Sequence, residues 1–282
     1  MKYIYLVIVV FAIALQNIIK KAYNKKTDTP DSFCFSLFST LSGLLFFLSC
    51  AGFTPAFDSS LLPYALGFGV SFSAAMAGSF LAIKYGSLSI TMLVLSYSLI
   101  VPTFYGLFAL NDDIGAIGIT GIALLFVSLF LINKTEEKAK INMKWVISLT
   151  LSFIGNGMCS LVQKLQQLDF NGAYKNEFMI YSLAIASVLL LMFTLLKKEN
   201  AIRCLRTGGL LCLSCGLANG VVNYLVMVLT GLIHNSILFP TISAGGIVIG
   251  FISALFFYKE KLSKLQLIGY FIGTVSVVLL NI

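Results

Sequence analysis

Residues 114–133 read IGAIGITGIALLFVSLFLIN, and residues 262–281 read LSKLQLIGYFIGTVSVVLLN. Both stretches have the length and hydropathy of a helix that crosses a bilayer, which takes about 20 mostly apolar residues. They align without gaps, and the matched positions are Gly121 with Gly269, Ser128 with Ser276, Leu131 with Leu279 and Asn133 with Asn281. Two similar membrane helices at the ends of two halves of the chain predict an internal duplication.

The composition of the whole chain points to the same class of protein. Of its 282 residues, 59% are hydrophobic and only 11% are charged, whereas about a quarter of a typical soluble domain is charged. Helices satisfy their own backbone hydrogen bonds in lipid, so a helical bundle is expected. The net charge of +8 is attributed to Lys and Arg flanking membrane helices, and no basic stripe interleaved with aromatics favours nucleic acid as a partner.

Ten stretches are predicted to span the membrane. They cover residues 3–20, 33–53, 62–83, 87–110, 115–132, 145–164, 178–196, 208–230, 234–257 and 262–281. We expect the first to be retained as a helix, because no small-x-small cleavage site precedes Lys20-Lys21 and further spans follow.

The central charged connector, residues 134–144, divides the chain into a first five-helix repeat, residues 1–133, and a second, residues 145–282. A further match lies near the start of each repeat, where the segment QNIIK ending at Lys20 resembles SLVQK ending at Lys164. An odd number of helices per repeat gives the repeats opposite orientations, and inverted repeats place a ligand site near the midplane between them. The predicted fold is therefore an all-α membrane protein of ten transmembrane helices, arranged as two inverted five-helix repeats.

Basic residues predict the orientation in the membrane. Sixteen of the 19 Lys and Arg residues lie in the connectors after the odd-numbered helices, and three lie on the opposite side. Cytoplasmic loops carry the excess of Lys and Arg. We expect a multi-pass protein of the inner (plasma) membrane with a cytoplasmic central connector and both termini on the non-cytoplasmic side.

Residues 258–269, YKEKLSKLQLIG, follow the pattern acidic-x-Leu-Ser-x-x-Gln-x-x-Gly just before the last apolar run. The first half holds a degraded copy, with Asp112 in place of Glu260 and Gly118 in place of Gln266. Residues 82–89, AIKYGSLS, and Pro102 in the fourth predicted helix add to the pattern. On these residues the chain resembles the drug/metabolite transporter superfamily, in its ten-helix EamA-like branch.

The resemblance implies a polytopic carrier with a central cavity between its halves and with helices 5 and 10 at the periphery. It does not name the substrate. Small multidrug-resistance relatives carry a glutamate eight residues before a lysine at the end of helix 1. Here the residue eight before Lys20 is Ala12, and the residue eight before Lys164 is Asn156, so that proton-binding carboxylate is absent.

No acidic residue lies in the middle of a predicted span, which argues against proton antiport through a carboxylate. Asp112 and Glu260 form a matched acidic pair at helix starts, and we interpret them first as helix caps.

Polar residues in the middle of the spans are the candidates for substrate binding, because buried amides in lipid face other helices or a wet cavity. The candidates are Gln16, Asn17, Ser71, Ser96, Tyr97, Asn156, Gln163, Asn219, Asn223, Tyr224 and Thr241. The alternative for each is an ordinary interhelical hydrogen bond. Lys20 and Lys164 either snorkel to the interface or contact an anion. Pro102 and Pro240 are predicted hinges, since proline removes a backbone donor.

These features favour a secondary transporter that moves a small polar, neutral or zwitterionic metabolite, such as an amino acid, by alternating access. The alternatives are an exporter of lipophilic drugs, or a non-transporting subunit of a lipid-linked sugar flippase. We expect no enzyme activity, because no hydrolase motif is found. We expect no cofactor or metal either, since Cys212 and Cys215 lie in an apolar run and are interpreted as packing residues. The expected partners are a small-molecule substrate and the bilayer, with the chain as a monomer or a homodimer.

Overall fold

The computed structural model describes residues 2–27, 30–56, 58–99, 101, 115–133, 142–230, 232, 242–243, 245–246, 248–249, 251–253, 255–256 and 263–279. Over these residues the chain is all-α, with nine α-helices and two short 3-10 helices. Six of the helices are long and apolar enough to cross a membrane. The prediction of a multi-span helical membrane protein is therefore confirmed.

Each α-helix overlaps a predicted span. Before the central connector lie α1 (Lys2–Lys26), α2 (Ser32–Cys50), η1 (Ser59–Leu61), α3 (Leu62–Tyr85), α4 (Leu88–Ser96), η2 (Tyr97–Leu99) and α6 (Ala116–Asn133). After it lie α7 (Met143–Asp169), α8 (Lys175–Leu196), α9 (Ala201–Thr230) and α11 (Lys264–Leu279). The described residues between 242 and 256 are helical as well and fall inside the predicted span 234–257.

Two helices extend well beyond their predicted ends. α1 continues to Lys26, and Lys25 and Lys26 in its last turn interact favourably with the negative end of the helix dipole. α9 starts at Ala201, where the Asn200 side chain accepts a hydrogen bond from the Arg203 backbone N–H at 2.9 Å. Gly208 inside α9 has non-helical backbone angles (φ −152°, ψ 27°), so the kink coincides with the predicted start of this span and a short helical segment, residues 201–207, precedes it. Both extensions contain charged residues, which a hydropathy criterion does not select.

The fourth predicted helix is not one continuous α-helix, which corrects the expectation for residues 87–110. α4 ends at Ser96 and tightens into the 3-10 helix η2. The sequence offers a reason: Pro102 has no backbone N–H to donate to the carbonyl four residues earlier, at Ser98. A short 3-10 segment inside a helix often marks a hinge.

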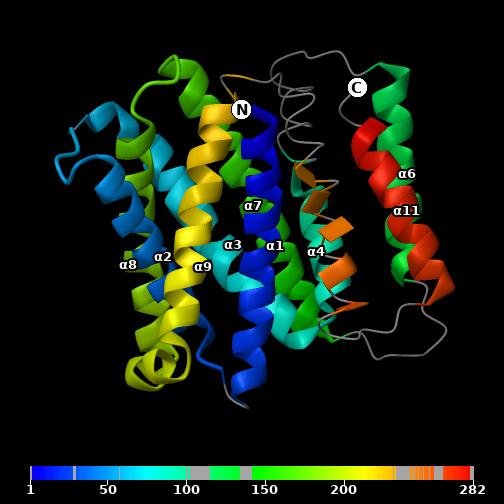
Figure 1. Ribbon diagram of the computed structural model, residues 1–282, viewed down its shortest axis with the longest axis horizontal. Helices are drawn as coiled ribbons and strands as arrows, with labels where there is room; N and C mark the ends of the chain where they lie inside the picture. The colour runs from blue at the N-terminus through cyan, green and yellow to red at the C-terminus, as the bar shows by residue number, and fades with distance from the viewer. Residues whose placement is uncertain are drawn as a thin grey trace.

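The long helices pack through close backbone contacts. α3 lies against α7 and α8, while α9 lies against α1 and α2, and α2 also contacts α8 (Figure 1). Glycines permit these approaches: a Cβ added at Gly155 of α7 would lie 2.7 Å from the Ser71 carbonyl oxygen of α3, and one at Gly78 would lie 2.8 Å from that of Ser148. Small residues let membrane helices come close where no hydrophobic driving force separates them from lipid.

α6 and α11 form a separate antiparallel pair at one edge of the bundle (Figure 1). The Ser128 hydroxyl of α6 donates to the Gly269 carbonyl of α11 at 2.7 Å, and the Ser276 hydroxyl of α11 donates to the Gly121 carbonyl of α6 at 2.7 Å. Tyr97 of η2 joins this pair to the bundle through a 2.8 Å hydrogen bond with the Ser128 hydroxyl. These serines and glycines are two of the four pairs of positions that the sequence alignment matched.

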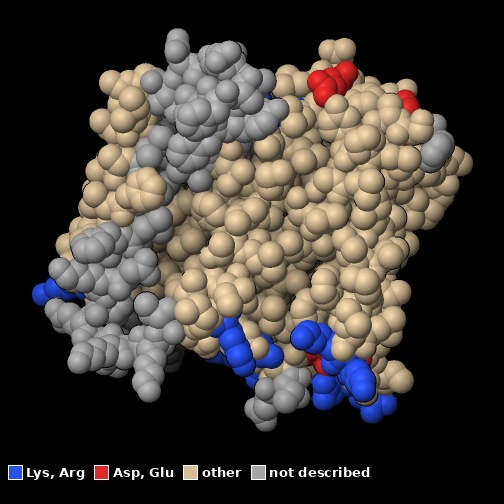
Figure 2. All heavy atoms as spheres, turned by 180° about the vertical axis from the view of Figure 1, so that it is seen from behind, with Lys and Arg blue, Asp and Glu red and all other residues tan. Residues whose placement is uncertain are grey.

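Charge is distributed unevenly between the two ends of the bundle. Lys and Arg gather at the lower end, where α1 ends and α9 begins, and Asp and Glu appear at the upper end (Figure 2). At the basic end the two oxygens of Asp31 accept from Arg203, with Nε–Oδ2 at 2.8 Å and Nη2–Oδ1 at 2.5 Å. Glu199 accepts from the Ser32 and Cys34 backbone N–H groups at the start of α2, at 3.0 and 2.7 Å. The bias agrees with the sidedness used to predict orientation.

Candidate functional site

A polar cavity of about 230 Å³ lies between helices that come from both sides of the central connector. α1, α3, α4 and η2 contribute to its wall from before the connector, and α7, α9 and residues 242–246 contribute from after it. Its polar lining consists of Gln16, Asn17, Lys20, Ser79, Ser96, Ser98, Asn156, Ser160, Gln163, Asn219, Asn223 and Ser243.

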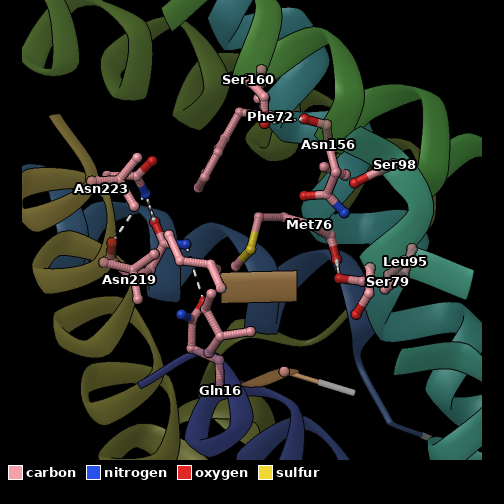
Figure 3. Close-up of a pocket in the computed structure, with 18 of the residues that line it drawn as sticks. Gln16, Phe72, Met76, Ser79, Leu95, Ser98, Asn156, Ser160, Asn219 and Asn223 are labelled. Carbon is pink, nitrogen blue, oxygen red and sulfur yellow. Dashed lines mark hydrogen bonds between the residues drawn. The ribbon is translucent and has the colours of Figure 1, made fainter. Parts of the chain in front are cut away.

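Three amides form a chain of hydrogen bonds across one wall of the cavity. Asn223 Nδ2 donates to the Asn219 side-chain oxygen at 3.0 Å, and Asn219 Nδ2 donates to Gln16 Oε1 at 3.0 Å (Figure 3). The two asparagines are one helical turn apart on α9, so they share a face, and Gln16 faces them from α1. Because Gln16 accepts through its oxygen, its Nε2 is the group that can donate. It makes a long 3.4 Å hydrogen bond to the Ala12 carbonyl, and its second N–H can donate to a solute.

The opposite wall comes from α7. Asn156 Nδ2 donates to the Ser152 hydroxyl at 3.3 Å, and the Ser160 hydroxyl donates back to the Asn156 carbonyl at 3.1 Å. Gln163 lies one turn further along the helix, and its side chain is 9% exposed. Its buried Nε2 has no hydrogen-bond partner among the described residues, and an unmatched buried donor is costly unless a ligand or water meets it.

Lys20 is the charged residue among the side chains that line the cavity. Its side chain is 4% exposed, and its Nζ lies 2.7 Å from the Ser79 hydroxyl of α3. The structure thus excludes for Lys20 the snorkelling that the sequence allowed. Lys164, the matched lysine of α7, is partly exposed and does not line the cavity.

The remaining lining is mostly apolar. It includes Phe68, Phe72, Met76, Met92 and Leu95 on α3 and α4. Ligand pockets typically combine such an apolar wall with a few placed polar groups. The arrangement is suited to reversible binding of a small molecule. Among the described residues, no group of three or more His, Cys, Asp or Glu side chains is placed to hold a metal ion.

The structure brings seven of the predicted site residues into the cavity wall: Gln16, Asn17, Ser96, Asn156, Gln163, Asn219 and Asn223. Three others lie elsewhere. Ser71 donates to the Gly67 carbonyl inside α3, Tyr97 bonds with Ser128, and Tyr224 packs with the ring of Phe46. The predicted residues Thr241, Pro102, Pro240, Asp112 and Glu260 lie outside the described residues.

Four polar lining residues, Ser79, Ser98, Ser160 and Ser243, are not among the predicted site residues. The sequence could have indicated Ser79, because it follows Phe72 and Met76 at helical spacing and all three lie on the face of α3 that lines the cavity. The others are hydroxyls in helices, where bonding to the helix's own backbone is the usual outcome.

Comparison with known proteins shows the fold and no function. No protein-family model matches the chain. An uncharacterized protein of Haemophilus influenzae is 24% identical over 180 residues, which make up 61% of this chain and 59% of that protein. This chain therefore spans less than two thirds of that relative's length. One solved crystal structure superposes with a TM-score of 0.67 and 11% identity, covering 99% of this chain and 96% of the other. The helical arrangement is thus a known one along the whole chain.

Proposed function

We propose that this protein is a secondary transporter that carries a small polar metabolite across the membrane by alternating access. The observation that carries the proposal is the cavity itself: amide, hydroxyl and lysine side chains surround an open volume inside a bundle of membrane-spanning helices. Polar groups in lipid are expensive and mark solute pathways when they line a cavity. A volume of about 230 Å³ is below the range typical of pockets for drug-sized ligands, which favours a solute about the size of an amino acid.

Two inverted five-helix repeats are part of this proposal, and the contacts support them. If helix n of the first repeat corresponds to helix n of the second, exchanging the repeats turns the α3–α7 contact into the α9–α1 contact, and the α3–α8 contact into the α9–α2 contact. All four contacts are extensive. The Ser128–Gly269 and Ser276–Gly121 hydrogen bonds exchange in the same way.

A matched pair of close approaches supports the repeats further. A Cβ added at Gly69 of α3 would meet the Ser182 carbonyl of α8, and a Cβ added at Gly216 of α9 would meet the Ser39 carbonyl of α2. Ser39 and Ser182 are 143 positions apart, and Gly69 and Gly216 are 147 apart. Lys20 and Lys164 are separated by 144 positions, and Gly121 and Gly269 by 148. The separation is 143 or 144 near the start of the repeat and 147 or 148 further along it, as expected for one duplication with small insertions and deletions.

We therefore propose, as an extension of this function, that the chain is a member of the drug/metabolite transporter superfamily that its closing motif resembles. The α6–α11 pair at the edge of the bundle corresponds to the peripheral helices 5 and 10 that the resemblance implies. The halves would rock about the cavity and expose it to one side at a time. η2, where the fourth helix changes from α to 3-10 geometry, is the described segment best placed to bend.

Solute uptake by reconstituted protein tests the proposal. Purified wild-type protein in liposomes is expected to take up a labelled metabolite saturably. Asn219→Leu removes the central member of the amide chain and leaves Gln16 and Asn223 without that partner, so uptake should fall at least about tenfold. Leu210 is 75% exposed on the lipid-facing side of the same helix. Leu210→Ile is therefore the matched control and should transport normally.

Two results would count against the proposal at different levels. Normal uptake by Asn156→Leu, Asn219→Leu and Asn223→Leu alike would remove the amides from the site. Folded wild-type protein that moves no solute from a broad panel of metabolites would remove the transport function.

A second candidate is export of lipophilic compounds, which the apolar wall of Phe68, Phe72, Met76 and Met92 favours. Drug susceptibility of a deletion strain separates the two: increased sensitivity to several unrelated lipophilic compounds, without loss of metabolite flux, would favour this candidate.

A further inference from the structure

Lys20 is a buried cation without a buried anion. Its side chain lies inside the bundle, about 9 Å along the axis of α1 from the last residue of that helix at Lys26, given the helical rise per residue. Among the described residues, no carboxylate lies within ion-pair distance of its Nζ, and the salt bridge recorded at this end of the bundle joins Arg203 to Asp31. An unpaired charge in a low-dielectric interior is strongly unfavourable, so an anion bound beside Lys20 would stabilise the charged form of this lysine.

Hydrogen bonding at Lys20 is also incomplete. An ammonium has three N–H donors, and the structure gives it one partner among the described residues, the Ser79 hydroxyl at 2.7 Å. The Ser79 hydroxyl in turn donates to the Met76 carbonyl at 3.1 Å, so Ser79 is oriented to accept from the lysine. This arrangement holds the ammonium at the cavity wall with donors to spare.

Neighbouring donors lie on the same face of α1. Gln16 is one turn before Lys20, and residues four apart on a helix are neighbours. Gln16 Oε1 accepts from Asn219, and Asn17, which also lines the cavity, is three residues before Lys20. Gln16 Nε2 and Asn17 Nδ2 each donate to a carbonyl four residues earlier, at 3.4 and 3.2 Å. An amide has two N–H donors, so one N–H of each side chain remains for an acceptor-rich group.

The charge count defines the ligand class. Lys20 contributes one positive charge, and no second Lys, Arg or His is among the described residues that line the cavity. A ligand of net charge −1 makes the occupied cavity neutral, whereas a zwitterion leaves it positive and a phosphate dianion makes it negative. Uncompensated charge is costly in this environment. From the lone buried lysine and its spare donors, we propose that the solute is a small monocarboxylate whose carboxylate binds Lys20.

The basic end of the bundle supports this assignment. Lys20 lies six residues before the end of α1, whose last turn holds Lys25 and Lys26, and Lys and Arg gather at one end of the bundle (Figure 2). A positive rim raises the local concentration of anions.

Gln163 has no part in the carboxylate site. Lys20 contacts Ser79 of α3, whereas Cys159 of α7, one turn before Gln163, contacts the Phe68 carbonyl of α3. Ser79 and Phe68 are about 16 Å apart along α3, by the helical rise. The unpaired Nε2 of Gln163 therefore lies at the other end of the cavity from Lys20.

This inference rests on the proposed transport function, and it replaces the neutral or zwitterionic solute expected from the sequence with a monoanionic one. The test compares shape-matched probe pairs on full-length protein: lactate with lactamide, benzoate with benzamide, and isocaproate with the zwitterion leucine. Each labelled probe, at micromolar to millimolar concentration, is offered to proteoliposomes containing wild-type protein, Lys20→Met, Lys20→Arg or Lys26→Met. Lys26 is exposed on the same helix, so its substitution makes the same change in net charge away from the cavity.

We expect saturable uptake of at least one carboxylate and at least about tenfold less of its neutral or zwitterionic partner, the ratio typical of one charged hydrogen-bonded contact. Lys20→Met should lose carboxylate uptake by about ten- to a hundredfold. Lys20→Arg should retain part of it, and Lys26→Met should match wild type.

Equal uptake of a carboxylate and its neutral or zwitterionic partner, or undiminished carboxylate uptake by Lys20→Met, overturns the inference and leaves the proposed transport function standing. Uptake of neutral or zwitterionic probes alone has the same meaning. Absence of uptake of every probe, by protein that still melts cooperatively, counts against the inference and against the proposed function together. Partial folding of Lys20→Met is recognised from its melting temperature. In that event Lys20→Gln, which keeps a donor toward Ser79 and removes the charge, decides the question.

Discussion

The contact between α3 and α8 at Gly69 allows a sharp test of the packing. A Cβ added at Gly69 would lie 2.8 Å from the Ser182 carbonyl oxygen and 2.9 Å from Ile185 Cγ2. Two residues earlier on the same helix, a Cβ added at Gly67 would lie 3.4 Å from Val162 Cγ2, which is ordinary contact. Alanine at the two positions makes the same chemical change in the same helix, so Gly67→Ala is the control for Gly69→Ala.

The magnitude follows from that difference. Alanine stabilises a helix by up to about 1 kcal/mol relative to glycine, and both variants gain this. At Gly69 the obstacle is backbone, which cannot rotate away, so α8 must move by roughly 0.5 Å to restore van der Waals distance; overpacking of this kind costs about 1–3 kcal/mol. Gly69→Ala should therefore be less stable than Gly67→Ala by about 1–3 kcal/mol, or roughly a factor of 5 to 150 in the ratio of folded to unfolded protein.

Reversible unfolding of the purified protein in mixed detergent micelles, followed by circular dichroism, measures this difference. We expect Gly67→Ala to unfold at the wild-type denaturant concentration or slightly above it, and Gly69→Ala to unfold below it. If Gly69→Ala proved as stable as Gly67→Ala, α3 and α8 would not approach at this point, and the helix arrangement around the cavity would be wrong.

Further predictions concern the α6–α11 pair, the connector before α9 and the orientation in the membrane. Ser128→Ala should cost more stability than Ser276→Ala, because the first breaks two hydrogen bonds and the second breaks one of about 0.6 kcal/mol; equal losses in the same unfolding assay would refute this. Burial raises the pKa of the Glu199 carboxyl above its usual range, against the lowering effect of the backbone N–H groups at the start of α2. The folded state thus binds this proton more tightly than the unfolded state, so stability should fall as pH rises from about 4.5 through the folded pKa, and Glu199→Gln should remove that slope. An unchanged slope in the variant would exclude Glu199 as its source. Cysteines added at either terminus should react with an impermeant maleimide from outside intact cells, and reaction only after permeabilisation would reverse the predicted orientation.

Much of the fold was predictable from the sequence because hydropathy alone locates membrane helices. The last turn of α1 and the part of α9 before the kink at Gly208 were not, since those turns lie among charged residues and the second begins at a cap, Asn200. The break between α4 and η2 was also missed, because a hydropathy window does not distinguish α from 3-10 geometry.

The candidate site was predictable where the residue type limits its environment. Amides such as Asn219 and Asn156 must find polar partners in a membrane, and both line the cavity. Ser71 donates its hydroxyl to a carbonyl of its own helix, and the ring of Tyr224 packs against Phe46. Which side of α3 or α9 faces the cavity depends on how these helices cross their neighbours, which the sequence does not give. The burial of Lys20 was equally beyond the sequence, since a lysine near a helix end either snorkels outward or turns inward.

Accessibility of Asn156 to water tests the central claim most directly. In a variant whose native cysteines are replaced and which still transports, Asn156→Cys is treated with a small water-soluble thiol reagent, and lipid-facing Leu151→Cys, 46% exposed on the same helix, serves as the control. The account predicts that the cysteine at position 156 reacts, that transported solute slows the reaction, and that the cysteine at position 151 stays unreactive. A position 156 that reacts no faster than position 151, with or without solute, would mean that the amides border no solute-filled cavity, and the account would fail.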